Sequence, residues 1–159
     1  MATAKGASIT ITPVDDILVT RLRDFVDSGG DTTPLMGRLG EHFVGTTQER
    51  FETETDPDGN AWKPLSPGYI KRKKQNQDLV LTLNAYLRRY IAPQVLSPNE
   101  VAWGSNRIYA AIHNWGGDGT GKNGTMPKRQ YLGVSADDNT EALAIVQDWL
   151  HRKLNGLPD

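Results

Sequence analysis

Three histidines offer the first chemistry to consider, because an imidazole can ligate a metal ion or act as a general base. His42, His113 and His151 lie in separate predicted elements. None has the second histidine and the glutamate at helical spacing that mark a metal-hydrolase helix, and metal sites need ligands that converge. We interpret all three as surface or interface histidines. His113 is the most interesting, because Tyr109, Trp115 and a pair of glycines flank it.

A group of acidic residues near a turn could in principle hold a divalent cation. Glu52, Glu54, Asp56 and Asp58 alternate with other residues there. Their spacing does not match a calcium-binding loop, which has a glycine in its middle and a glutamate at its end. Solvated acids at a turn are the simpler interpretation.

The glycine-rich stretch at residues 116–122 resembles a phosphate-binding loop only in composition. A Walker loop needs Gly-Lys followed by Ser or Thr at the start of a helix, whereas Lys122 is followed by Asn123 and soon by Pro127. No serine has the nucleophile-elbow pattern, and the chain has no cysteine. The sequence therefore predicts no catalytic centre, no metal site and no cofactor, and we expect a non-enzymatic protein.

A short basic run is the remaining candidate for chemistry. Lys71, Arg72, Lys73 and Lys74 follow one another and could contact DNA phosphates. The same run could be a solvated helix face, or could pair with acidic residues of a neighbouring subunit. We favour the solvated face and keep a nucleic-acid binding module, with these four residues facing DNA, as the alternative function.

The composition describes a modest globular chain. Its 159 residues fit a single domain, with flexible ends predicted at about residues 1–7 and 156–159. The apolar fraction of 37% is low and the 16 glycines are many, which favours long loops or a core completed by a neighbour. The net charge of −1 predicts no global attraction to nucleic acid or membrane. We also expect no signal peptide, no membrane span and synthesis in the cytoplasm.

Hydrophobic periodicity and turn residues predict an α+β fold, with a small antiparallel sheet packed against several helices and joined by long loops. An antiparallel hairpin is predicted over 91–96 and 100–104, around Ser97-Pro98-Asn99. Residues 81–90 suggest a short helix, or a helix running into a strand, and 109–114 are of uncertain type. The predicted helices span about 13–28, 34–55, 67–74 and 137–154, the last capped by Asp137, Asp138 or Asn139, and the remaining predicted strands span 8–12 and 131–134.

Four stretches, taken in order, resemble a known family. They are Arg50-Phe51 with the Asp56-Pro57-Asp58-Gly59 turn through Trp62 to Ser66, the basic run with residues 81–88, residues 101–117, and residues 126–133. The third is the closest, because Trp103-Gly104-Ser105-Asn106 precedes Tyr109, His113 and a glycine pair. Together the stretches resemble the phage virion morphogenesis family, also described as tail completion proteins of Mu-like and related phages. Asn84, where the family has glycine, and Lys128, where it has a small residue, depart from the pattern.

The resemblance implies a structural role in finishing a phage tail or in joining it to the head, with no catalytic residues and no cofactor. It implies a subunit of the virion tail or neck that assembles in the host cytoplasm. By analogy with the sixfold symmetry of phage necks, we expect a homo-oligomer, a hexameric ring. The partners implied are tail tube, terminator, stopper or connector proteins, with transient contact to passing DNA and none to a membrane.

We predict that large aromatic residues and the glycine loop form the interface with other subunits. We expect the loop at 116–124 to be mobile in the free subunit and fixed in the particle, and we assign Trp149 to the core because it lies on the apolar stripe of its helix. The predicted interface residues are Trp62, Trp103, Tyr109, His113, Trp115, Gly116, Gly117, Pro127 and Arg129.

Overall fold

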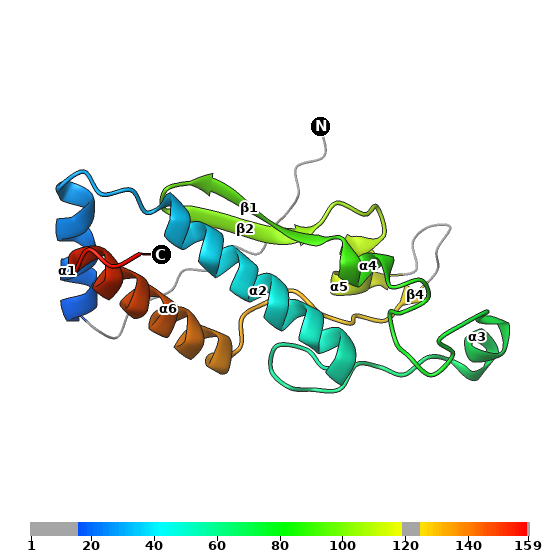
Figure 1. Cartoon of the computed structure of the whole chain (residues 1–159). Helices are drawn as coiled ribbons and strands as arrows, with labels where there is room; N and C mark the ends of the chain where they lie inside the picture. The colour runs from blue at the N-terminus through cyan, green and yellow to red at the C-terminus, as the bar shows by residue number, and fades with distance from the viewer. Residues whose placement is uncertain (1–15, 119–124, 159) are drawn as a thin grey trace.

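The long helix α2 (Thr33–Thr53) organises the fold. The computed structural model describes residues 16–118 and 125–158. The molecule is elongated, and α2 crosses its middle diagonally, with a hairpin of strands β1 (Ile91–Ser97) and β2 (Glu100–Ser105) above it and helix α6 (Ala136–Leu154) below it (Figure 1). Helix α2 contacts all three of these elements. The predicted α+β class is therefore confirmed.

The apolar stripe predicted for α2 is confirmed. Leu35, Leu39, Phe43, Thr47 and Phe51 recur every fourth residue and are all buried. Pro34 in the first turn favours the helix start, because its missing N–H would have no partner there. The helix ends at the left-handed Glu54, before the predicted turn.

The hairpin packs closely on α2 because a glycine faces it. The predicted antiparallel hairpin is confirmed, and its register places Ile91 opposite Ser105 and Pro93 opposite Trp103. A Cβ atom on Gly40 would lie 2.7 Å from Cβ of Pro93 and 2.9 Å from Cγ2 of Val101. Only glycine therefore allows the helix and the hairpin to approach this closely.

The other helices agree with the predicted pattern, with differences at their ends. Helix α1 (Asp16–Asp27) packs Phe25 edge-on against Trp149 of α6, with ring centroids 5.3 Å apart. Helix α3 (Pro67–Arg72) is capped by Ser66, and α4 (Tyr86–Arg89) runs directly into β1. The cap of α6 is Ser135, in a capping box with Asp138, and not one of the three residues we expected. The predicted strand at 8–12 lies outside the described residues.

The strand predicted at 131–134 is wrong. Among the described residues no partner strand lies beside this segment, and side chains bind its backbone groups instead. The amide oxygen of Asn114 accepts hydrogen bonds from the backbone N–H groups of Tyr131 and Leu132, at 3.0 and 2.9 Å. The guanidinium of Arg50 donates to the carbonyl oxygens of Tyr131 and Gly133, at 3.1 and 3.0 Å.

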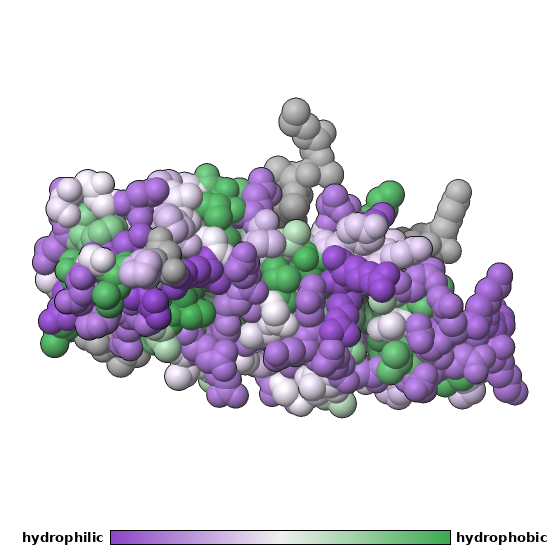
Figure 2. Space-filling view, in the orientation of Figure 1, coloured by the Kyte–Doolittle hydropathy of each residue, from purple (hydrophilic) through white to green (hydrophobic). Residues whose placement is uncertain are grey.

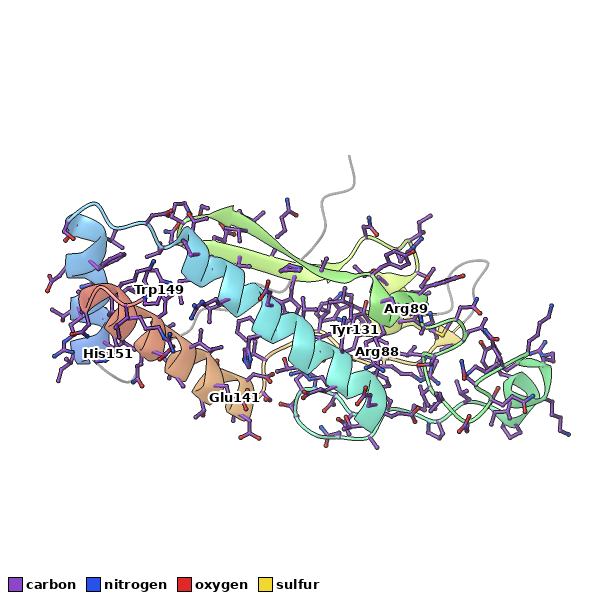
Figure 3. All side chains as sticks on the ribbon, in the orientation of Figure 1. Arg88, Arg89, Tyr131, Glu141, Trp149 and His151 are labelled. Carbon is purple, nitrogen blue, oxygen red and sulfur yellow. The ribbon has the colours of Figure 1, made fainter. Side chains whose placement is uncertain are left out.

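The core has two parts that meet along α2. One lies between α1, the first half of α2 and α6, and includes Trp149. The other surrounds Phe51, Trp62 and Tyr131, beside α4, β1 and helix α5 (Ala110–Trp115), the stretch of uncertain type. Trp103 packs against both parts. Figure 3 shows Trp149 and Tyr131 on either side of the molecule's middle.

Candidate assembly interface

Helix α5 is held in place by hydrogen bonds between its residues and the segment at 129–132. Asn114 is buried and binds the backbone at 131–132, as described above. The hydroxyl of Tyr131 donates in return to the carbonyl of Ala110, at 3.0 Å, and the backbone N–H of Arg129 donates to the carbonyl of His113, at 2.9 Å. The third and fourth family stretches are therefore one structural unit. Sequence reasoning missed the role of Asn114, although it lies inside the motif that carried the resemblance.

Two of the four tryptophans are buried, and a third, Trp103, is partly buried against the core. Trp149 is fully buried, as predicted. Trp62 is buried and its indole N–H donates to the carbonyl of Gln130, at 2.9 Å. Trp103 stacks on Phe43, with centroids 4.6 Å apart, and donates to the hydroxyl of Thr47, at 3.1 Å. Trp115 alone among the four is half exposed, so it is the tryptophan that another molecule can reach.

Other exposed apolar side chains gather at the end of the molecule that carries α3 to α5. Ile108 is fully exposed, at 101%, just before α5. Sequence reasoning missed most of this set, because periodicity alone cannot distinguish an exposed leucine or tyrosine from a buried one. Figure 2 shows apolar groups among strongly hydrophilic ones at this end. We call the set the distal patch: Tyr69, Ile70, Leu79, Leu83, Tyr86, Tyr90, Ile108, Tyr109 and Trp115.

A cleft opens beside this patch, where α3 projects from the body of the molecule (Figure 1). Its volume is about 890 Å³. Apolar and aromatic side chains form much of its wall, among them Leu83, Tyr86 and Tyr109, and Pro127 of the predicted interface set also lines it. The basic side chains on the wall are Lys63, Arg72, Lys73, His113 and Arg129, and no Asp or Glu among the described residues lines the cleft. We call this the distal cleft.

Two cations of the distal cleft are buried without a carboxylate. The ammonium of Lys73 donates to the carbonyls of Asn76 and Leu79. The guanidinium of Arg129 donates to the carbonyls of Lys63 and Pro64, at 2.7 and 3.1 Å. Within the described ranges, neither cation has a carboxylate oxygen within 4.0 Å. Burial lowers the pKa of each side chain, which means that the protein environment disfavours the charge it contains.

His113 lies on the wall of the same cleft. Its ring meets Tyr109 edge-on, with centroids 5.9 Å apart, and its Nδ1 is buried without a hydrogen-bond partner among the described residues. Burial and, second, the nearby charge of Arg129 lower its pKa. The imidazole is therefore held in its neutral form, in accord with our interpretation of a structural or interface histidine.

The chain matches the phage virion morphogenesis family over residues 10–151. It belongs to that family. A protein of Escherichia phage Mu, whose name describes it as capsid assembly protein G, is 31% identical over 105 residues, covering 62% of this chain and 67% of its own length. The Mu-like prophage FluMu G protein 2 of Haemophilus influenzae is 29% identical over 133 residues, covering 83% of this chain and 88% of its own length. No solved structure gives a significant match.

Membership of this family gives the chain a structural or assembly role in building a phage particle. In the part of the chain that the structure describes, no three His, Asp or Glu side chains converge in a way that could hold a metal ion. The described helices include none that is long and apolar enough to cross a membrane.

The basic run of this family member does not act as one surface. Helix α3 ends at Arg72, and Lys71, Arg72 and Lys74 are exposed. Lys73 turns inward, and only 5% of it is exposed, because its ammonium closes the turn at 76–79. Of the four residues predicted to face DNA, three are therefore accessible.

The glycine pair of the third family stretch has a geometric cause. Gly116 ends α5 at a φ of 80°, and a Cβ there would lie 3.0 Å from the backbone N of Lys128 and from the carbonyl oxygen of Met126. Gly117 begins β3 (Gly117–Asp118), which pairs with β4 (Thr125–Met126). The rest of the predicted glycine loop, 119–124, lies outside the described residues.

The charges of the chain are segregated along the sequence. Residues 61–129 hold eleven Lys and Arg against three Asp and Glu, a net charge of +8. The remaining residues hold seven Lys and Arg against sixteen Asp and Glu, a net charge of −9. Figure 3 places Arg88 and Arg89 toward the end that carries the distal cleft, and Glu141 away from it, on α6. The near-neutral total therefore conceals a strong segregation of charge along the sequence.

Proposed function

We propose that the chain is a structural tail completion or head–tail joining subunit, a neck or terminator protein, that acts by ring assembly and docking rather than by catalysis. The distal patch is the observation that carries this proposal. Exposed apolar side chains that gather at one end of a molecule are characteristic of surfaces that bind other proteins. The family supports a role in particle assembly, and the name of the Mu relative refers to the assembly of a capsid.

The proposed assembly is a homo-oligomer, a hexameric ring in the virion tail or neck that forms in the host cytoplasm. Sixfold symmetry is proposed because phage tails and necks have it. An elongated subunit with exposed apolar side chains at one end is suited to head-to-tail contacts. Such contacts close into rings when the rotation between neighbouring subunits allows it. We propose tail tube, terminator, stopper or connector proteins as its neighbours.

The substitution Ile108→Asp tests whether the distal patch is needed for assembly. Because Ile108 is fully exposed, the substitution removes no internal packing and should leave the thermal unfolding temperature of the isolated chain unchanged. It should abolish oligomers in sedimentation velocity, and it should prevent a phage that carries only this variant from forming joined, infectious particles. Leu96→Asp is the matched control, since Leu96 is half exposed on β1, outside the distal patch.

Electron microscopy of phage lysates tests the function itself. A phage without this gene should accumulate separate heads and unfinished or unjoined tails. Complete virions formed without the protein would refute the proposed function, whatever the oligomeric state of the purified chain.

The alternative function is a nucleic-acid binding module. It is favoured by the exposed Lys71, Arg72 and Lys74 and by the net charge of the segment that contains them. Binding to duplex DNA should then weaken steeply with salt, by a slope of about 0.9 per phosphate contact. The double variant Lys71→Ala/Lys74→Ala should reduce that slope by about 2. A lack of measurable binding at low salt would eliminate this alternative.

A further inference from the structure

The distal cleft contains cations that call for an anionic group. Charged side chains are seldom buried unless they are paired. Arg129 is 5% exposed and has five N–H donors, and its hydrogen bonds to the carbonyls of Lys63 and Pro64 use two of them. Arg72, on the exposed rim, adds a second guanidinium. Glu54 attracts both buried cations electrostatically, and Asp78 also attracts Lys73. Among the described residues, however, no acidic side chain lines the cleft or lies within 4.0 Å of either cation, so a carboxylate that enters the cleft would pair with them directly.

The walls of the distal cleft indicate that this anion belongs to a larger, partly apolar group. Leu83 and Tyr86 are 40% and 48% exposed and both line the cleft. A small inorganic anion would leave these side chains in water, whereas a peptide segment would cover them while its carboxylate meets the guanidinium groups.

We propose that the distal cleft receives an acidic segment from a second copy of this chain, with a carboxylate at Arg129 and Arg72 and apolar side chains against Leu83 and Tyr86. This inference rests on the proposed ring assembly and names the surface through which it occurs. The contact is heterologous, because the cleft of one copy meets a different surface of the next. Repetition of such a contact generates a closed ring or a filament.

The charge segregation identifies a second copy as the occupant. The segment 61–129, which forms the cleft, has a net charge of +8, and the rest of the chain has −9. One copy therefore provides the charge that the cleft of another requires. Duplex DNA fits less well. Lys73 and Arg129 are almost fully buried in a concave site, out of reach of a phosphate backbone, and the acidic remainder of the chain would repel DNA.

Two matched substitutions at the same end of the molecule test the inference. Arg72→Glu reverses the charge at the rim of the distal cleft, and Arg89→Glu makes the same change on α4, outside the cleft. Both side chains are exposed, so both variants should fold, which circular dichroism and thermal unfolding can verify. In sedimentation velocity, Arg72→Glu should weaken self-association at least tenfold and Arg89→Glu less than threefold. Leu83→Ser, a second variant of the cleft wall, should also weaken self-association.

A mixing experiment tests the head-to-tail geometry. Arg72→Glu loses its cleft but retains its acidic surface, so one copy can still dock into the cleft of a wild-type neighbour. The variant should be monomeric alone and should shorten wild-type assemblies when it is added to them. A symmetric contact would instead exclude the variant from wild-type assemblies, and that result would overturn the inference.

The outcomes separate this inference from the proposed function. If the wild type associates and Arg72→Glu associates equally well, the cleft is not the contact, while ring assembly stands. If the wild type does not associate at any concentration, both the inference and ring assembly fail. If Arg72→Glu and Arg89→Glu lose association equally, net positive charge and not the cleft governs assembly, and the inference is wrong. Loss of DNA binding with unchanged self-association in Arg72→Glu would favour the alternative function and overturn the inference.

Discussion

Replacing Arg50 with methionine tests whether one buried guanidinium joins the elements of this fold. Arg50 lies on the buried face of α2 and only 6% of it is exposed. It forms an ion pair with Asp138, in the first turn of α6, and donates to the carbonyls of Tyr131 and Gly133. Helix α2 is thereby tied to α6 and to the irregular segment before it.

The expected loss of unfolding free energy in Arg50→Met follows from the buried groups that lose their partner. Methionine occupies a similar volume but donates no hydrogen bond, so the Asp138 carboxylate would stay buried without its cation. Removing one partner of a buried ion pair costs about 3–5 kcal/mol, and the two abandoned carbonyl groups act in the same direction. Domains of this size have unfolding free energies of about 5–15 kcal/mol. Arg50→Met should therefore remove a large share of the stability.

Urea unfolding followed by tryptophan fluorescence measures this cost. Arg88→Met is the matched control, because Arg88 pairs with Glu52 at the surface, where an ion pair contributes less than about 1 kcal/mol. If Arg50→Met costs no more than Arg88→Met, the guanidinium does not hold these elements together. The double variant Arg50→Met/Asp138→Asn should cost less than the sum of its single changes, since the two side chains interact directly.

Three further predictions concern packing, protonation and charge. Gly40→Ala and Gly45→Ala gain the same helix propensity, but of the two positions Gly40 faces the hairpin. In urea titrations the free energy of unfolding of Gly40→Ala should therefore be about 1–3 kcal/mol lower than that of Gly45→Ala. The pKa of His113 lies below its ordinary value of 6.5, so the unfolded chain takes up a proton first as the pH falls. The free energy of unfolding should therefore decrease below about pH 6.5, and it should decrease less in His113→Gln. Self-association through the distal cleft should weaken from about 0.1 M to about 1 M salt in sedimentation experiments, because the Debye length falls from about 10 Å to about 3 Å; an unchanged association constant would exclude a charge-based contact.

The regular elements were predictable because their patterns are local. The spacing of apolar residues in α2 and the turn residues of the hairpin each act over a few positions, and both elements occur where they were predicted. The segment at 131–134 was not predictable in this way. It has the composition of a strand, yet its backbone groups bind Asn114, 17 and 18 residues away, and Arg50, more than 80 residues away. Patterns within the segment contain no information about such distant partners.

The candidate interface was predicted only in outline. The predicted set included Tyr109, His113, Pro127 and Arg129, and the structure brings all four to the distal cleft. It could not distinguish Trp62, which the core encloses, from Trp115, which is half exposed. Both are large aromatic residues next to family motifs, and their difference arises from the packing of Phe51 and Gln130 around Trp62.

The net charge alone does not describe the electrostatics of this chain. A total of −1 predicts no attraction to other molecules only if the charges are evenly mixed, because the field outside a molecule depends on how its charges are distributed. The segment 61–129 concentrates positive charge, and the fold places Lys63, Arg72, Lys73 and Arg129 around a cleft that no described Asp or Glu lines. A chain whose charges are segregated but whose net charge is small can attract copies of itself through unlike segments, without the overall repulsion that a highly charged chain would experience. The segregation of charge, and not its total, is therefore the property on which the proposed contact between copies rests.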